Sequence, residues 1–369
     1  MTHAFFVPNE RLIVLLKQLS IIMTKERISY IDFGAGIMIL WMILGHAFMA
    51  AGFTSPSVQR SGLTDYIPNF LFFFMPWFFY KSGQFFNKKN RKDSWSKDWR
   101  KLIQPFLVWS AIGYISYLIS LVVYDNFTFR NVIYLVVRHF VLGGSIDLNH
   151  PLWFLLTLFG VRQIANIILP YENDKYYLQK NILITLVAYS IGLGLYCLNC
   201  RFVPIWIANG STGLAYFTLG YCMQKYETKW MLFVPSLFVY IVCCVWGFPG
   251  IDMHSNYCEN AIRYVVSLPA SFAGIVVFNF ACDLIAKYLH YLSLPFEKIG
   301  KYAMIIYVSH GIIYGSVPWI IDLLHCTLTY TCALCVILGS YVIFLPLLCI
   351  LSQKISDRGI LDKIRKIQS

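Results

Sequence analysis

Two ionisable residues, Asp32 and His46, lie within one apolar run, and both side-chain types can take part in proton transfer. The positions of Asp32, Ala35, Ile39, Met42 and His46 follow a spacing that places them along one face of a helix. At about 1.5 Å of rise per residue, the carboxyl and imidazole groups are roughly 20 Å apart, which excludes an Asp–His dyad. His46 is therefore a candidate general base on its own, the alternative being an interfacial histidine that caps the helix.

Three more ionisable side chains lie within apolar runs, namely Lys81, Asp283 and His310. Such groups are costly at membrane depth and tend to face a partner or a cavity. Tyr307 and His310 are spaced to share one helix face, and His310 is a candidate second base, oxyanion donor or structural hydrogen-bond donor. By the helical rise, His310 is expected about 12 Å from the inner end of its run, at a different depth from His46. Asp283 is expected to be solvated.

The elements that must position these residues are membrane helices. The chain has 369 residues, of which 58% are hydrophobic and 13% charged. Apolar runs of about 18 to 22 residues match the roughly 30 Å hydrocarbon core of a bilayer. We predict an all-α polytopic membrane protein with about ten transmembrane helices and a short interfacial or re-entrant helix over 131–143. The expected spans are 30–51, 66–86, 103–123, 152–170, 182–198, 204–222, 230–247, 264–285, 302–320 and 331–352.

The distribution of positive charge predicts the orientation. With both termini in the cytoplasm, all but five of the 30 Lys and Arg residues fall on the cytoplasmic side. The formal net charge of +12 is then explained by topology, so we expect membrane lipids and no nucleic acid as partners. The expected organisation is a cytoplasmic or interfacial segment at 1–29, one transmembrane domain at 30–352 and a basic cytoplasmic tail at 353–369. Met23 is a candidate for the true start.

The cysteines lie mostly within apolar runs, where Cys behaves as a small hydrophobic residue. Cys197 and Cys200 form a C-x-x-C pattern without the second pair that a zinc site requires, so we expect no metal. The alternative is a disulfide among Cys197, Cys200, Cys258 and Cys326.

Five stretches, taken in order, resemble the acyltransferase-3 family of bacterial multi-pass membrane O-acyltransferases. These are YIDFGAGIMILWMILGH at 30–46, FFFMPWFFYKSGQFF at 72–86, RKLIQPFLVWS at 100–110, PLWFLLTLF at 151–159 and IGKYAMIIYVSH at 299–310. The resemblance implies O-acetylation of a cell-surface glycan or its lipid-linked precursor, with cytoplasmic acetyl-CoA or another acyl-CoA as donor. It also implies the bacterial cytoplasmic membrane as the location, and it identifies His46 as the family's histidine.

The sequence departs from the family pattern at Ala35, where the family usually has Arg or Lys eleven residues before the histidine. By the helical rise, Lys81 in the second run lies at a depth similar to that of Ala35. We hypothesise that Lys81 replaces the missing cation, either paired with Asp32 or facing the donor. The alternative is that Lys81 extends to the inner interface.

The remaining site candidates divide between the two sides of the membrane. Arg100 and Lys101, with Ser82, are candidates for binding the phosphates of the acyl-CoA, although the basic cluster also serves topology. Trp153 and Tyr307 are candidates for acceptor binding, the alternative for Trp153 being the interfacial aromatic belt.

Two other functions compete with acyl transfer. A transporter or flippase of lipid-linked glycans also fits ten spans with intramembrane polar residues, although the two halves show no convincing self-similarity. A non-catalytic family member is the other alternative, because Ala35 lacks the expected charge.

Overall fold

The computed structural model describes residues 10–54, 70–123, 127–142, 149–198, 203–224, 230–248, 250–326 and 328–368. Side chains at 10–28, 53–54, 141, 205 and 351–368 are not described. Within the described ranges the chain is helical throughout its regular structure and contains no strand, apart from an isolated bridge between Asp252 and Tyr257. The predicted all-α class is confirmed.

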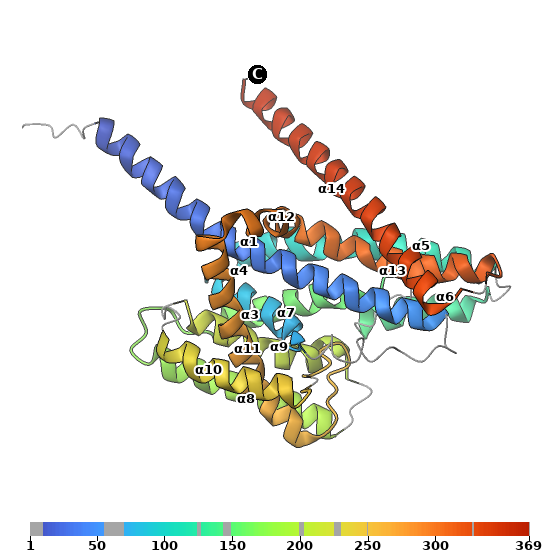
Figure 1. Cartoon of the computed structure of the whole chain (residues 1–369), viewed down its shortest axis with the longest axis horizontal. Coiled ribbons are helices and arrows are strands. Elements are labelled where there is room, and N and C mark those ends of the chain that lie inside the picture. Colours follow the sequence, from blue (N-terminus) through green and yellow to red (C-terminus); the bar gives the residue numbers. More distant parts are fainter. Residues whose placement is uncertain are drawn as a thin grey trace, which may run out of the picture. The chain divides into compact units, whose positions relative to one another are not determined.

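The helices follow one another in the order shown in Figure 1. Their bounds are α1 Glu10–Thr54, α3 Phe74–Gln84, α4 Arg91–Asp98, the π-helix η1 Trp99–Ile103, α5 Gln104–Val123, α6 Phe129–Val136, the π-helix η2 Val137–Val141, the 3₁₀ helix η3 His150–Leu152, α7 Trp153–Ile168, α8 Tyr177–Cys197, α9 Ile205–Cys222, α10 Trp230–Val245, α11 Ala261–Tyr288, α12 His290–Lys301, α13 Ala303–Leu323 and α14 Tyr330–Gln368.

A polytopic membrane protein follows from the length and composition of these helices. Within the described part of the chain, seven helical segments are long and apolar enough to cross a bilayer. They are Ser29–Gly52, Arg91–Val123, His150–Ile168, Tyr177–Cys197, Ala261–Tyr288, Ala303–Leu323 and Tyr330–Ile350. The other three predicted spans contain α3, α9 and α10, which are shorter or less apolar, and residues 55–69 before α3 lie outside the described ranges. The count of ten and the orientation of the termini stay predictions.

Contacts divide the chain into two compact units, Met1–Leu40 with Phe278–Ala303 and Trp41–Val277 with Met304–Ser369. In the first unit, α1 and α12 pack backbone to backbone. A Cβ added to Gly36 would lie 2.0 Å from the carbonyl oxygen of Phe296, and one added to Gly300 would lie 1.8 Å from that of Asp32. Only glycine permits so close an approach, so these two residues fix the position of Asp32 relative to α12.

In the second unit, α9 packs against α3, α7 and α8 (Figure 1). The contact with α3 is again made through glycines. A Cβ at Gly83 would lie 1.9 Å from the carbonyl oxygen of Phe217, and a Cβ at Gly220 would lie 1.9 Å from that of Tyr80. Gly83 therefore allows the backbone of α3 to approach that of α9 closely.

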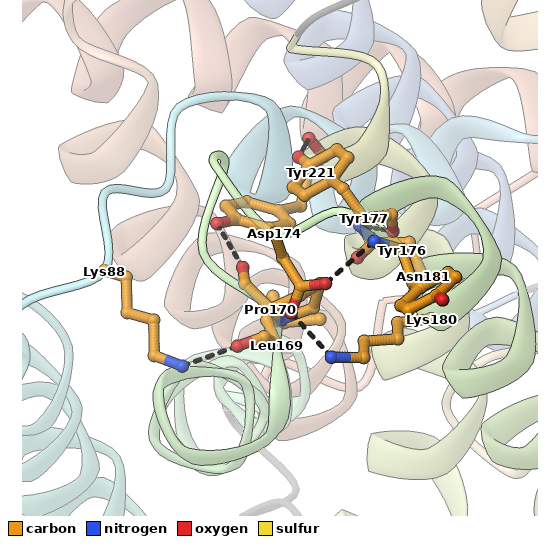
Figure 2. A network of polar contacts seen from close by, with 9 residues as sticks. All are labelled: Lys88, Leu169, Pro170, Asp174, Tyr176, Tyr177, Lys180, Asn181 and Tyr221. Carbon is orange, nitrogen blue, oxygen red and sulfur yellow. Dashed lines mark hydrogen bonds and ion pairs between the residues drawn. The ribbon is translucent and has the colours of Figure 1, made fainter.

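The connection between α7 and α8 is held in place by side chains from distant parts of the sequence, as Figure 2 shows. The ammonium group of Lys88 donates to the carbonyl oxygen of Leu169 at 2.5 Å, and the hydroxyl of Tyr221 donates to that of Pro170 at 2.9 Å. These bonds satisfy backbone carbonyls that have left helix α7, and they join this connection to α9 and to the segment before α4.

Candidate active site

His46 of α1 and His310 of α13 form the centre of the candidate site. His46 Nδ1 and His310 Nε2 are 3.0 Å apart, and the two rings stack with centroids separated by 5.0 Å and planes inclined by 23°. His310 is fully buried, whereas His46 is only partly buried, with the ring of Tyr314 at 5.3 Å. The structure thus brings His46 and His310 into contact, although the sequence placed them at different depths in the membrane.

The expected difference in depth is wrong for a geometric reason. It assumed that each helix starts at the end of its apolar run and that all runs share one level. Helix α1 instead extends from Glu10 to Thr54, far beyond the apolar run, while α13 begins at Ala303. Distances counted from these unequal starting points do not describe the relative height of two side chains.

The hydrogen bonds fix the tautomers of both rings when they are neutral. His310 Nδ1 lies 2.6 Å from the backbone carbonyl oxygen of Tyr307, which can only accept, so His310 Nδ1 carries the proton. His310 Nε2 is then an acceptor, and His46 Nδ1 must donate to it. The lone pair of His46 Nε2 remains available to take a proton, as a general base requires.

Several contacts hold the backbone of α13 in place around His310. Asn149 Nδ2 donates to the carbonyl oxygen of Val308 at 3.1 Å, and the hydroxyl of Tyr307 donates to the carbonyl oxygen of Pro151. A Cβ at Gly311 would lie 2.2 Å from Asn149 Oδ1, so glycine is required where this side chain meets the helix. The predicted acceptor-binding residue Tyr307 is buried and occupied by these contacts.

A second pair of imidazoles adjoins the first. His150 of η3 and His254, in the connection between α10 and α11, have ring centroids 4.7 Å apart and planes inclined by 56°. The ring of Trp153 lies 5.7 Å from that of His254, and its side chain is buried. Both histidines are close enough to His46 for their charges to interact with it. Four of the eight histidines in the chain therefore gather at one place.

Two ring nitrogens of this second pair are buried without a hydrogen-bond partner among the described residues. They are His150 Nδ1 and His254 Nε2. Burial lowers the pKa of His254, the carboxylate of Asp252 opposes this shift, and the guanidinium of Arg138 adds to it. In the part of the chain that the structure describes, no three His, Cys, Asp or Glu side chains are arranged to hold a metal ion.

The segment that carries His254 is fixed by a buried polar network. Asn256, with a positive φ of 50°, accepts at Oδ1 from the hydroxyls of Thr212 at 3.1 Å and Tyr264 at 2.8 Å. Its Nδ2 donates to the carbonyl oxygen of Gly192 at 3.0 Å. Helices α8, α9 and α11 thus all contribute to the conformation of this connection.

Two further contacts set the position of His254 itself. Its backbone carbonyl accepts from Asn209 Nδ2 at 2.7 Å, and its backbone N–H donates to Asp252 Oδ1 at 2.9 Å. Gly250 has a φ of +74°, and a Cβ there would lie 2.7 Å from the carbonyl oxygen of Phe72. These contacts fix the backbone that carries His254, whose ring lies against that of His150.

Asp32 is half-buried and belongs to the first unit, where its carboxyl interacts electrostatically with Lys301 and Glu297. Glu297 accepts hydrogen bonds from Ser29 Oγ at 2.6 Å and from Ser293 Oγ. Sequence reasoning missed Lys301 as a cation near Asp32, although it lies within the IGKY stretch of the family resemblance. The hypothesis that Lys81 pairs with Asp32 or faces the donor stays a prediction.

Lys81 is buried on α3, with only 7% of its surface exposed. Its ammonium group donates to Gln84 Oε1 at 3.0 Å and lies 5.7 Å from the ring centre of Trp77 and 5.9 Å from that of Phe85. The adjacent residue Ser82 points toward a different cation, because Arg162 Nη1 donates to its hydroxyl at 3.1 Å.

A cluster of cations lies near this point. Arg162 pairs with the buried Asp98 through a Nε–Oδ1 distance of 3.0 Å. The charge of Lys97 interacts with those of Lys89, Lys101 and Arg162, and Asp98 is the anion among its interacting groups. The predicted phosphate-binding residue Lys101 belongs to this group, whereas the exposed Arg100 donates to the backbone and hydroxyl of Ser96 at 3.2 Å. Arg162 was not among the candidates that the sequence suggested.

The structure describes three of the four cysteines for which the sequence left a disulfide as the alternative. Cys197, Cys258 and Cys326 are free thiols, and Cys200 lies outside the described residues.

The fold and the site together define a multi-pass helical membrane protein built around a hydrogen-bonded histidine pair. The sequence model of the acyltransferase-3 family, described as an acyltransferase domain, matches residues 28–351. The chain belongs to this family, and its activity is that of a membrane acyltransferase. Neither a curated protein nor a solved structure gives a significant match to the chain.

Proposed function

We propose that this acyltransferase moves an acetyl or other acyl group from acyl-CoA to a hydroxyl of a cell-surface glycan or its lipid-linked precursor, in the bacterial cytoplasmic membrane. The observation that carries the proposal is the chain of contacts from the Tyr307 carbonyl through His310 to His46. This chain presents an unprotonated Nε2 on a partly buried imidazole, which is the group that an attacking hydroxyl needs.

The proposed reaction is a direct transfer. The hydroxyl oxygen of the acceptor attacks the thioester carbonyl carbon while His46 Nε2 takes the hydroxyl proton. The tetrahedral intermediate then collapses with cleavage of the C–S bond, and the proton passes to the thiolate of CoA. His46 Nδ1–H donates a hydrogen bond to His310 Nε2, which stabilises the imidazolium form of His46. The Tyr307 carbonyl oxygen accepts from His310 Nδ1–H and keeps His310 in the tautomer that can accept.

The donor side of the proposal rests on the cation cluster around Lys97. Lys89, Lys97, Lys101 and Arg162 bring more positive charge together than Asp98 compensates, and phosphate groups such as those of CoA favour such sites. We propose that these groups bind the donor and that buried Lys81 contributes to the same function. Full retention of activity in a Lys81→Ala variant, with an unchanged KM for acyl-CoA, would overturn the role of Lys81.

The test of the function is direct measurement of acyl transfer. The full chain, reconstituted in lipid vesicles, is supplied with acetyl-CoA and a glycan acceptor, and both CoA release and ester formation are followed by mass spectrometry. We expect ester formation by the wild type and its loss in His46→Ala. NMR of surface polysaccharide from cells with and without the protein provides the corresponding measurement in vivo.

A matched control is His325→Asn, because His325 is exposed after α13 and Asn readily adopts its φ of 51°. This variant is expected to keep wild-type activity. If His46→Ala forms the ester as fast as His325→Asn, the proposed base is wrong. Unchanged glycan acetylation in the absence of the protein would contradict the function itself.

A further inference from the structure

We propose that His150 and His254 form an acceptor subsite that binds hydroxyl groups of a polyhydroxylated ring, such as a sugar, beside the base His46. The inference rests on the proposed function and deepens it, because it assigns the acceptor class to two residues outside the catalytic pair. The expected ligand is an uncharged polyol, with one hydroxyl at His46 and neighbouring hydroxyls at the second pair.

The first support is the presence of unsatisfied hydrogen-bonding groups. His150 Nδ1 and His254 Nε2 are buried and have no hydrogen-bond partner among the described residues. Buried polar atoms are normally paired, since an unpaired one costs free energy, and an exception calls for an explanation. Hydroxyl groups of a bound acceptor would satisfy both nitrogens, because a hydroxyl can donate or accept.

The second support is the construction that holds His254 in place. Asn209 binds its carbonyl oxygen, Asp252 binds its N–H, and Asn256 ties the same connection to three helices. The backbone that carries the imidazole is thereby fixed, and the ring lies beside His150 and close enough to His46 for charge interaction. Such preorganisation lowers the entropy cost of binding a ligand.

The third support concerns charge. The groups that act electrostatically on both His150 and His254 are the cation Arg138 and the anion Asp252, whose opposite charges offset each other. Burial lowers the pKa of His254, which favours its neutral form. A neutral imidazole in surroundings of compensated charge suits hydroxyl groups better than a carboxylate or phosphate.

This arrangement would also select the acceptor. A ring with a single hydroxyl could reach His46 but would leave the nitrogens of His150 and His254 unpaired. Sites built to bind hydroxyl groups discriminate against analogues that lack them for this reason. We therefore expect a higher kcat/KM for a sugar than for a monohydroxy ring of similar size.

The test compares methyl hexopyranosides with cyclohexanol as acceptors for the full chain in lipid vesicles. In His254→Ala and His150→Ala we expect the KM for the best hexopyranoside to rise roughly 3- to 10-fold each, with kcat little changed. The KM for cyclohexanol should not rise in either variant, because cyclohexanol has no second hydroxyl to bond these imidazoles. His254→Gln, which keeps a polar donor and acceptor, should retain more of the affinity than His254→Ala.

Control and binding measurements keep the inference separate from the proposed function. His325→Asn is the matched control, and thermal unfolding checks that each variant folds. Saturation-transfer NMR measures binding of the same hexopyranosides without turnover, so the subsite is tested even if the wild type transfers no acetyl group. Equal binding by the wild type and a His150→Ala/His254→Ala double variant, or an equal loss of turnover with both acceptors, would overturn the subsite.

Discussion

The two histidine pairs lie next to each other but are built differently. His46 and His310 share a direct hydrogen bond at 3.0 Å and stack at 23°, and a backbone carbonyl fixes the tautomer of the inner ring. His150 and His254 are as close by ring centre, at 4.7 Å, yet they are tilted by 56° and each has a nitrogen without a partner in the described structure.

This difference teaches how similar side chains acquire different chemistry. The hydrogen bond between His46 and His310 uses one nitrogen of each ring, and the Tyr307 carbonyl occupies the other nitrogen of His310. His46 Nε2 is then the one nitrogen of the pair with a free lone pair. Tilted imidazoles without such a bond keep their nitrogens for a ligand. The first pair is therefore suited to moving a proton and the second to binding hydroxyl groups, and substitutions can test this distinction.

The largest effect is expected where the hydrogen-bonded pair meets the substrate. His46→Ala removes the only nitrogen proposed to take the hydroxyl proton, so kcat should fall about 10²- to 10⁴-fold. His254→Ala should change kcat little by comparison. Steady-state kinetics of CoA release measures both. Similar losses of kcat in the two variants would erase the distinction between the pairs.

A smaller effect is expected at the buried ring of the same pair. His310 acts through His46 as a positioning residue, so His310→Ala should lower kcat by about 10- to 100-fold. His310→Gln should recover part of this loss, because its amide oxygen can accept from His46 Nδ1. A pH profile of kcat/KM provides the second readout, since loss of the supporting ring should move the basic group's apparent pKa. An unaltered profile in His310→Ala would indicate a purely structural ring.

Gly311 provides a milder way to disturb the first pair without removing an imidazole. In Gly311→Ala the new Cβ would lie 2.2 Å from Asn149 Oδ1, so Asn149 or α13 must move. We expect roughly a 10-fold loss of kcat from misplacement of His310 and a destabilisation of about 1–3 kcal/mol. Gly339→Ala is the matched control, because no atom lies within 4 Å of its added Cβ. Equal behaviour of the two variants in kinetics and thermal unfolding would contradict this packing.

The smallest predicted effect concerns the second pair and acid. The folded protein lowers the pKa of His254 through burial, so the unfolded chain binds a proton at a higher pH than the folded one. Stability is then fully present above the unfolded pKa of about 6.5 and declines as the pH falls below it. Between pH 7 and pH 5, thermal unfolding of His254→Gln should shift less than that of the wild type. Asp252, Arg138 and His150 surround the group and remain unchanged in this variant.

Much of the molecule could be predicted from local patterns. Apolar runs of bilayer length indicated the membrane helices, and ionisable residues within those runs singled out His46 and His310. The family stretches identified His46 as the family's histidine. The short re-entrant or interfacial helix predicted at 131–143 corresponds to α6 and η2, which end at Val141, and residue 143 lies outside the described residues. The patterns did not reveal His150, although it directly precedes the PLWF stretch, because a single histidine at a helix start has no periodic signal.

Contacts between distant parts of the sequence could not be predicted in the same way. The hydrogen-bond partner of Ser82 comes from α7, and the packing role of Gly83 depends on α9. His254 lies in an irregular connection whose conformation depends on Asn256 and three surrounding helices.

By itself the sequence determined that this is a helical membrane protein of the acyltransferase-3 family, because hydrophobicity, charge asymmetry and ordered motifs are local properties of the chain. Only the tertiary structure decided which histidines meet and in which tautomers. That outcome depends on where α1 and α13 cross, on the carbonyl of Tyr307 and on the close approach of the Asn149 side chain that Gly311 allows. A few ångströms of helix placement separate a hydrogen-bonded base from an isolated imidazole, and no spacing along a single helix contains that information.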